Sequence, residues 1–365
     1  MNTLKQLVSI NSSNSQDEIV DFIKNKLKTK VKEIKIIRNK INNKPSILIG
    51  INTTLKSISP VVLSGHIDTV VPSTKEYNTD PFTLAELDEK LFGLGTIDMK
   101  SFTAIIIDNI EKIKSQPYPV IAALTTDEET TLCCIENVIE NLKKLKINPR
   151  LSIIGEPTKS KYKLMSKGCY EFTLELTGKT CHSSIPQNGV NAICAAAKII
   201  NFIEENQSRF NLTSNCGTII GGDATNKVAD KLELKFDIRS FDEDSVNLFI
   251  KEIENKLEEI KNNYVGLKYK LQNTLKIPAF YMKNMQKIKN LIKITKNEDI
   301  VFGGGCEAGY LTSYSGDAII FGVGDLALAH KPNEFVEIEE YKTYTKKFLK
   351  LLQKISKIYY EKTDS

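Results

Sequence analysis

Short apolar runs recur through the first 160 residues, and they constrain the fold of this chain more than any other feature. The segments 46–51 (SILIGI), 60–67 (PVVLSGHI) and 119–126 (PVIAALTT) have the length and composition of buried strands. Helical or polar stretches separate them, and 101–114 (SFTAIIIDNIEKIK) is the clearest helical pattern in this half. Alternating strands and helices predict an α/β fold with a central mixed sheet flanked by helices.

A different pattern begins at about Lys163. The segments 170–178 (YEFTLELTG) and 231–240 (KLELKFDIRS) alternate apolar and polar residues, as half-buried antiparallel strands do. Each is followed by an amphipathic helical pattern, 189–206 and 246–263. This order predicts a small inserted α+β domain that ends near residue 276. Beyond it we expect a turn-rich segment at 301–311 (VFGGGCEAGYL) and a closing helix at 337–360.

Length and charge set broad limits on the function. The 365 residues exceed what one hydrophobic core usually supports, which favours two domains. The net charge is +5, and 46 of the 50 basic residues are lysines spread along the chain. A nucleic-acid-binding protein is expected to gather its basic residues in a patch and to use arginine for phosphate and base contacts. The chain does neither, so we expect no nucleic-acid partner.

The cysteines and the apolar segments favour a cytoplasmic protein. Seven cysteines form no C-x-x-C pair, and their odd number argues against a disulfide framework and against a thiolate zinc site. No segment approaches ~18 consecutive apolar residues, and the first 16 residues lack the apolar core and the cleavage site of a signal peptide. We therefore expect a cytoplasmic protein with no membrane partner.

Two polar residues end the second of the apolar runs. His66 and Asp68 stand in LSGHIDTV, and in an extended chain residues i and i+2 point to the same side. The imidazole of His66 could bind a metal through one nitrogen while Asp68 fixes its tautomer through the other. A solvated or hydrogen-bonded pair is the alternative, because H-x-D alone is a weak motif.

Asp98 is a further candidate ligand, and it has two possible functions. It follows two glycines in LFGLGTIDMK and directly precedes a predicted helix. Its carboxylate could cap the N-terminus of that helix. Its two oxygens could also bridge two metal ions about 3.5–4 Å apart. Capping would not exclude bridging, so the sequence leaves both functions open.

Carboxylates and imidazoles also stand at other predicted strand and loop ends. Glu128 and Glu129 lie in LTTDEET, and Glu156 lies in LSIIGEPT. Taken singly, each of these is a common surface residue. The histidines are more informative, because the chain has only three and each lies in a segment punctuated by Gly or Pro: His66, His182 and His330. Such segments often present functional side chains from a rigid scaffold.

These side chains suit a hydrolytic metal site. Histidine and carboxylate ligands without thiolates fit zinc, cobalt or manganese, and an open coordination position holds a water whose pKa falls to ~7. Such a water needs a base that takes its proton and returns it to the leaving nitrogen. One glutamate of the pair Glu128 and Glu129 is the candidate for that base.

With these motifs identified, the chain resembles the M20 family of two-zinc metallopeptidases and deacylases. Eight segments match the family's motifs in order and at about their spacing: GHIDTV, DPFTL with LFGLGTIDMK, TTDEET, IIGEPT, CHSSIPQNGVNAI, GGDATN with FDIRS, CEA and AHKPNEF. The resemblance covers almost the whole chain. It implies a discontinuous catalytic domain, residues 1–163 and 276–365, interrupted at 164–275 by a lid that usually makes a dimer.

For the metal centre, the resemblance implies two divalent ions, with zinc expected and cobalt as the alternative. Asp98 would bridge both ions. His66 and Glu156 would complete one site. Glu129 and His330 would complete the other, so that every ligand is an imidazole or a carboxylate.

The resemblance also implies the groups that perform the chemistry. Glu128 would be the general base and acid, and Asp68 would support the imidazole of His66. His182, in the lid, would reach the active site of the partner subunit and stabilise the oxyanion. A surface histidine before a turn is the alternative for His182.

The resemblance is less specific about the substrate-binding residues. Arg239 and Asn226 resemble lid residues that hold a substrate carboxylate, a task that suits a planar guanidinium. An arginine on a strand surface is the alternative. Gly304 and Gly305 could let the backbone approach the ligand, or they could simply form a turn.

Within the family, HSSIPQNGVNAI and GGDATN resemble the branch that removes the acetyl group from N2-acetyl-L-ornithine, which gives L-ornithine for arginine biosynthesis. The expected protein is a cytoplasmic homodimer that acts on a small N-acyl amino acid. A desuccinylase of succinyl-diaminopimelate, a deacetylase of acetylcitrulline or acetyllysine, or a dipeptidase would share every ligand and differ in the pocket. A non-catalytic scaffold would be expected to have lost ligands, and none is missing.

Overall fold

The computed structural model describes residues 1–73, 77–294 and 298–360, and the chain folds into two compact units. The first unit comprises Met1–Met165, Phe280–Phe302 and Cys306–Ser365. The second comprises Ser166–Ala279 and Gly303–Gly305. The chain therefore leaves the first unit near residue 165 and returns to it near residue 280.

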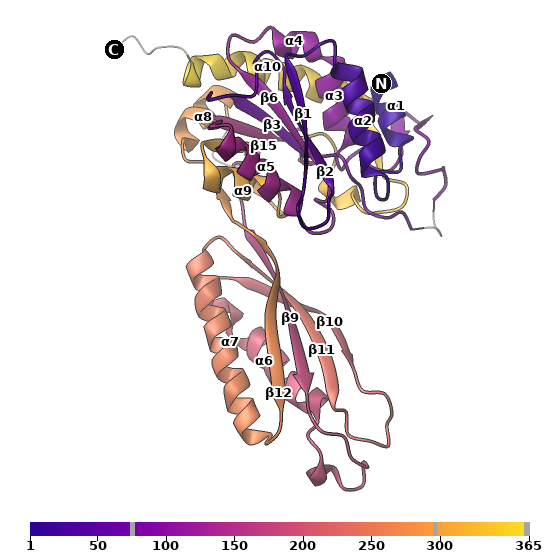
Figure 1. Ribbon diagram of the computed structural model, residues 1–365, viewed down its shortest axis with the longest axis vertical. Helices are drawn as coiled ribbons and strands as arrows, with labels where there is room; N and C mark the ends of the chain where they lie inside the picture. Colours follow the sequence, from indigo (N-terminus) through magenta and orange to yellow (C-terminus); the bar gives the residue numbers. More distant parts are fainter. Residues whose placement is uncertain (74–76, 295–297, 361–365) are drawn as a thin grey trace. The chain divides into compact units, whose positions relative to one another are not determined.

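A six-stranded mixed sheet forms the centre of the first unit (Figure 1), in the order β1-β2-β6-β3-β7-β15. Strands β6, β3, β7 and β15 are parallel to one another, whereas β1 pairs antiparallel with β2 and β2 pairs antiparallel with β6. Every residue of β3, β6 and β7 is buried, which accounts for their nearly continuous apolar runs. The bounds are β1 (Glu33–Arg38), β2 (Pro45–Gly50), β3 (Val61–His66), β6 (Val120–Thr125), β7 (Leu151–Ile154) and β15 (Asp317–Ile320).

Helices flank this sheet, as the sequence predicts (Figure 1). Helix α5 contacts β1, β2 and β6, α3 contacts β3, and α9 contacts β7 and β15. The helices of the unit are α1 (Asn2–Val8), α2 (Gln16–Leu27), α3 (Lys100–Asp108), α4 (Ile110–Lys114), α5 (Cys133–Lys144), α8 (Met285–Ile292), α9 (Glu307–Tyr314) and α10 (Ile338–Tyr359). Two small sheets complete the elements: β4 (Ala85–Leu87), β5 (Lys90–Phe92) and β16 (Phe335–Glu337), and β8 (Met165–Ser166), β13 (Phe280–Tyr281) and β14 (Val301–Phe302).

Two sequence predictions differ from the observed elements. The single helix expected at 101–114 is interrupted at Asn109, whose side chain donates a hydrogen bond to the carbonyl oxygen of Ile105 at 3.0 Å. The turn-rich prediction for 301–311 is wrong from residue 307 onward, where α9 begins. Ala308, Leu311 and Thr312 are buried at helical spacing, a pattern too short to stand out beside three glycines.

The second unit is an antiparallel sheet with two helices, in the strand order β10-β11-β9-β12. Helix α6 contacts β9, β10 and β11, and helix α7 contacts β11 and α6. The elements are β9 (Gly168–Thr177), α6 (Ala192–Asn206), β10 (Thr213–Gly221), β11 (Lys231–Ser240), α7 (Glu243–Asn263) and β12 (Lys268–Ile277). This α+β arrangement agrees with the alternating strand and helix patterns of the sequence.

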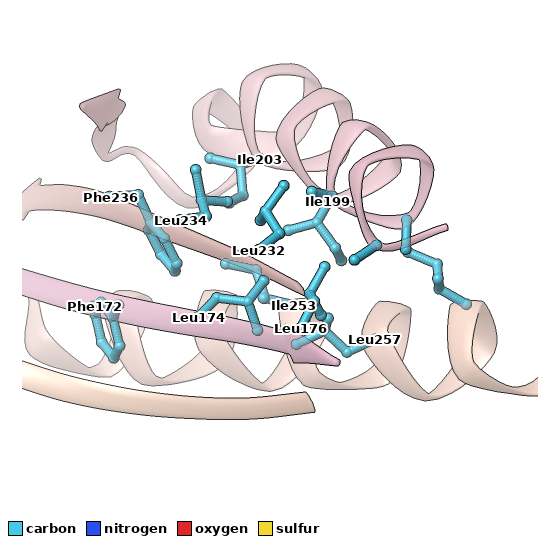
Figure 2. Packing of buried hydrophobic residues seen from close by; sticks show 14 of the residues in the cluster. Phe172, Leu174, Leu176, Ile199, Ile203, Leu232, Leu234, Phe236, Ile253 and Leu257 are labelled. Carbon is cyan, nitrogen blue, oxygen red and sulfur yellow. The ribbon is translucent and has the colours of Figure 1, made fainter. Parts of the chain in front are cut away.

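One face of this second sheet holds the hydrophobic core of the unit. Figure 2 shows alternate residues of β9 and β11, such as Leu174 and Leu234, directed toward Ile199 and Ile203 of α6 and toward Ile253 of α7. The intervening side chains of these strands, which include several Glu and Lys, are exposed or partly exposed, except for the buried Cys169 and Thr173. In the part of the chain that the structure describes, none of the helices is both long and apolar enough to cross a membrane.

Candidate metal centre

The sequence-predicted metal ligands of the first unit cluster at one edge of its sheet. His66 is the last residue of β3, Glu129 follows the end of β6 by four positions, and Glu156 follows the end of β7 by two. These three strands are parallel, so their carboxyl ends share an edge. Open α/β sheets bind ligands at that edge. The fold thereby brings residues far apart in sequence into one site.

Asp98 lies between two groups of side chains that could each hold a metal ion. One group is His66, Asp98 and Glu156, and the other is Asp98, Glu129 and His330, with the ligand atoms of each group within 4.8 Å of one another. Oδ1 of Asp98 is 2.8 Å from Nε2 of His66. Oδ2 of Asp98 is 3.3 Å from Nε2 of His330, and that nitrogen is 2.9 Å from Oε2 of Glu129. One oxygen of Asp98 therefore faces each group, as in a bridging carboxylate.

Asp98 does not cap the helix that follows it. Helix α3 begins at Lys100 and has Met99 as its N-cap, without a side-chain capping bond. The carboxylate of Asp98 is directed instead to the two imidazoles. Of the two functions that the sequence left open for this residue, the geometry is compatible with metal binding only.

Burial and mutual repulsion act on the acidic side chains of this centre. Burial raises the pKa of Glu156 well above its ordinary value, and the charges of Asp98 and Glu128 raise it further. Burial also raises the pKa of Glu128, and the neighbouring carboxylates add to that effect. For Asp98, burial acts to raise the pKa, but hydrogen bonds to the two histidines outweigh burial and lower it. Without a compensating cation, this set of carboxylates resists full ionisation.

The two imidazoles carry protons that a metal ion would displace. Hydrogen bonds to Asp98 and Glu129 raise the pKa of His330 to about 10. Burial acts to lower the pKa of His66, but contacts with Asp68 and Asp98 outweigh burial and raise the pKa well above its ordinary value. In the metal-free protein these imidazolium groups balance part of the carboxylate charge. Metal binding requires neutral imidazole and therefore releases these protons.

The donor set fits divalent metal ions. Oε1 of Glu156 is buried and, among the described residues, has no hydrogen-bond partner. A buried carboxylate oxygen without a partner is costly, and a cation at the adjacent group of ligand atoms would remove that cost. Imidazole nitrogen and carboxylate oxygen, without a thiolate, are donors that zinc, cobalt and manganese accept.

Asp68 contacts both the imidazole of His66 and the turn that follows β6. Its Oδ1 lies 3.5 Å from Nδ1 of His66, and its backbone oxygen lies 3.1 Å from the same nitrogen. Its two carboxylate oxygens also accept hydrogen bonds from the backbone N–H groups of Glu128 and Glu129, at 3.4 and 3.3 Å. Asp68 is therefore placed to orient the histidine and to fix the backbone of both glutamates.

The remaining predicted residues belong to the second unit. His182 is exposed, and its Nδ1 accepts a hydrogen bond from the backbone N–H of Ser184 at 3.2 Å. That contact favours the tautomer of a neutral imidazole with its proton on Nε2, which can then act as a donor. The carbonyl oxygen of Asn226 accepts a hydrogen bond from the N–H of Ser183 at 3.0 Å, so this asparagine neighbours the histidine loop.

Arg239 and the glycines have contacts of their own within the second unit. Nε of Arg239 donates to Oδ2 of Asp237 at 2.6 Å, which orients the guanidinium along the surface of β11. A Cβ added at Gly305 would lie 2.7 Å from Cδ1 of Ile277, so a larger residue there would require the end of the Ile277 side chain to shift. Gly304 lies beside Gly305 in the same unit.

Two buried glutamates lie in the motifs of the first unit, but sequence analysis assigned them no function. Glu307 accepts hydrogen bonds from the hydroxyls of Ser64, at 2.5 Å, and Thr125, and so connects β3 to β6 beside the metal centre. Glu334 accepts hydrogen bonds from backbone N–H groups of the loop that carries Asp98. The only sequence signal for Glu307 and Glu334 is that they stand in the segments CEA and AHKPNEF. No periodic pattern of apolar residues marks them.

The chain matches one protein-family model and is similar to several known proteins. The family model described as Peptidase family M20/M25/M40 matches residues 62–354. The acetylornithine deacetylase of Pasteurella multocida (strain Pm70) is 30% identical over 296 residues, which cover 76% of this chain and 76% of that protein.

Solved structures share the fold at lower sequence identity. A tripeptidase from Staphylococcus aureus subsp. aureus mu50 superposes with a TM-score of 0.80 and 22% identity, and the match covers 98% of this chain and 97% of the tripeptidase. A dinuclear metal-binding peptidase from Bacillus subtilis gives a TM-score of 0.71 and 16% identity, with 97% and 96% of the two chains covered. The fold of this chain is therefore one that solved proteins share.

Proposed function

The chain belongs to peptidase family M20/M25/M40, and from that premise we propose that it removes the acetyl group from N2-acetyl-L-ornithine, giving L-ornithine and acetate. It is a metal-dependent hydrolase of amide bonds. The observation that carries the hydrolytic reaction is the position of Asp98 between two groups of metal ligands. The relative named acetylornithine deacetylase supports the choice of substrate. With that substrate, the proposed place of the enzyme is arginine biosynthesis, in the cytoplasm.

The metal centre would hold two divalent ions, with zinc as the first candidate and cobalt as the second. Asp98 would bridge the ions. His66 and Glu156 would complete one site, and Glu129 and His330 the other. When bound, the ions would polarise the acyl carbonyl and lower the pKa of a water molecule. A pair of ions is supported by the donor set and by the Bacillus subtilis structure described as dinuclear.

Glu128 would be the general base and acid of the reaction. Its carboxylate would take a proton from water as the water oxygen bonds to the acyl carbon. It would then deliver that proton to the nitrogen as the C–N bond breaks, so that acetate and a free amine form. The backbone N–H of Glu128 donates a hydrogen bond to Asp68, which restrains the position of this residue. Glu128 is half-buried, so a water molecule could still reach its carboxylate.

The second unit would be the lid and the dimerisation domain. The free Nε2–H donor of His182 suits the stabilisation of an oxyanion, in the active site of the partner subunit. Arg239 would bind the α-carboxylate of the substrate, because Asp237 takes only its Nε and the guanidinium has further donors. The residues that would assist it are Asn226, Gly304 and Gly305.

A substrate panel tests this function. The zinc-loaded protein, with and without a chelator, is to be assayed on N2-acetyl-L-ornithine, acetylcitrulline, acetyllysine, succinyl-diaminopimelate and dipeptides. We expect chelator-sensitive hydrolysis with the highest kcat/KM on acetylornithine. Turnover of a dipeptide without turnover of acetylornithine would contradict the proposed substrate but not the membership of the family.

A further inference from the structure

Glu334 is a buried carboxylate beside the metal centre that the proposed reaction does not use. Its side chain is 3% exposed. Oε1 accepts hydrogen bonds from the backbone N–H groups of Ile97, at 2.5 Å, and Asp98, at 3.2 Å. Oε2 accepts a hydrogen bond from the N–H of Gly95 at 3.2 Å, and the carbonyl oxygen of Glu334 accepts one from Gly93 at 3.1 Å. One residue therefore binds four amides of the loop that ends in Asp98.

The backbone of that loop adopts a conformation that favours glycine at position 95. Gly95 has a φ of +81°, and a Cβ at this position would lie 2.9 Å from Cγ2 of Thr69. The backbone oxygen of Gly95 accepts a hydrogen bond from the N–H of Lys100 at 2.8 Å, which closes the loop. The N–H groups of residues 95, 97 and 98 converge on one point, and the two oxygens of Glu334 occupy it.

The same segment also supplies a metal ligand. His330 stands four positions before Glu334, and its Nε2 lies 3.3 Å from Oδ2 of Asp98. The segment 330–334 therefore contacts Asp98 twice, at the carboxylate through His330 and at the backbone N–H through Glu334. A shift of either contact would move the bridging carboxylate relative to both ligand groups.

We propose that Glu334 is a positioning residue, which holds the backbone of Asp98 so that its two oxygens face the two metal sites at once. The inference rests on the proposed dinuclear centre. It assigns to Glu334 an effect on metal affinity and coordination beyond its contribution to folding. Both carboxylate oxygens of Glu334 accept hydrogen bonds from backbone amides, so we assign Glu334 no direct part in the reaction.

The substitution Glu334→Gln tests this function at nearly constant size. A glutamine offers one acceptor oxygen and one NH2 donor, so at least one of the three amides faces another donor. We expect zinc affinity, measured by calorimetric titration of the metal-free protein, to fall by about 10–100-fold, as for other partners that orient metal ligands. The absorption bands of the cobalt-loaded protein are expected to change, and kcat is expected to fall more than KM rises.

A matched control is Asp317→Asn, which alters a buried carboxylate at the opposite end of the sheet. Oδ1 of Asp317 accepts hydrogen bonds from the backbone N–H groups of Lys283, at 2.7 Å, and Asn284, at 3.4 Å. This variant is expected to lower the melting temperature and to leave zinc affinity and the cobalt spectrum unchanged. If Glu334→Gln also lowered only the melting temperature, with wild-type affinity and spectrum, the inference would be overturned.

A second variant covers the case in which Glu334→Gln does not fold. Glu334→Asp keeps both acceptor oxygens on a shorter side chain, so we expect a folded protein with affinity between those of wild type and Glu334→Gln. Wild-type affinity in Glu334→Asp, with Glu334→Gln unfolded, would overturn the inference. All of these affinities are read without substrate, so a failure of acetylornithine turnover in wild type would count against the proposed reaction alone.

Discussion

Oδ1 of Asp68 lies 3.5 Å from Nδ1 of His66, on the side of the imidazole opposite to Asp98. The same carboxylate accepts the backbone N–H groups of Glu128 and Glu129. Asp68 therefore connects the proposed metal ligand at the end of β3 to the proposed base and the second proposed ligand, which follow β6. A change at Asp68 is expected to disturb both metal binding and proton transfer.

Asp68→Ala removes the acceptor that these three groups share. Because His66 loses the carboxylate beside its Nδ1 and keeps only the backbone oxygen of residue 68 there, we expect zinc affinity and kcat each to fall by about 10–100-fold. Titration of the metal-free protein and steady-state kinetics on acetylornithine measure the two effects. Asp80→Ala is the control, because Asp80 is an exposed carboxylate that caps a turn in the same unit. Equal, small effects in both variants would contradict the function assigned to Asp68.

Glu128 and Glu129 are adjacent in the chain but have different expected functions. Glu128→Gln should keep both metal ions and lose kcat by about 10²–10⁴-fold, since it lacks a base. Glu129→Gln should lose affinity at the site shared with His330, whose Nε2 lies 2.9 Å from Oε2 of Glu129. Metal analysis after dialysis separates the two. Identical metal content and identical residual activity in both variants would show that the functions are misassigned.

Some of these residues were predictable from the sequence for a physical reason. His66 and Glu156 directly follow apolar runs that are buried on both faces, and a polar side chain at the end of such a strand must lie at an edge of the sheet. Asp98 and His330 lie in loops, where no periodicity places a residue. Only the order of the motifs indicated that they meet.

The buried supporting contacts were not predictable in this way. Glu307 binds Ser64, 243 positions earlier in the chain, and Glu334 binds the amide of Gly95, 239 positions earlier. Both glutamates stand in segments that match the family's motifs, but their partners are hydroxyls and backbone amides. Such groups leave no charge pattern or spacing in the sequence, so the pairing emerges only with the fold.

Zinc binding is expected to depend on pH through His330. The pKa of this imidazole is raised to about 10 by Asp98 and Glu129, so it is protonated in the metal-free protein at neutral pH. Zinc must displace that proton, so affinity should rise with pH between 6 and 8, by up to about tenfold per unit for each proton released. Calorimetry in buffers of different ionisation enthalpy counts the protons. A release of no protons would contradict the expected coordination by His330.

The metal-free protein should show the opposite trend in stability. A raised pKa in the folded state means that the ion pairs of His330 stabilise the fold fully below its unfolded pKa of ~6.5. This contribution is lost as the pH rises toward the folded pKa of about 10. The melting temperature of the metal-free protein should therefore fall in that window more than that of His330→Gln. Parallel pH curves for the two proteins would contradict this sign.

The turn that carries Glu128 and Glu129 is held by a partly buried ion pair between Lys44 and Asp127. Asp127, with a φ of +82° and a fully buried side chain, accepts hydrogen bonds from Lys44, Thr130 and Thr131. Burial acts to raise the pKa of Asp127, but these hydrogen bonds outweigh it and hold the pKa below its ordinary value. The carboxylate thus stays charged in the interior because its partners compensate it.

Lys44→Met removes the cation and leaves the buried carboxylate of Asp127 with the hydroxyls of Thr130 and Thr131 and the side-chain amide of Asn42. We expect the metal-free protein to lose about 1–3 kcal/mol of unfolding free energy at pH 7, measured in urea. Asp127→Asn has no charge to compensate, so the loss caused by Lys44→Met should be much smaller in that background. Because the folded pKa of Asp127 is lowered, its contribution is present above about pH 4 and is lost as the pH falls further. A loss that is equal in both backgrounds would show that Lys44 acts through another contact.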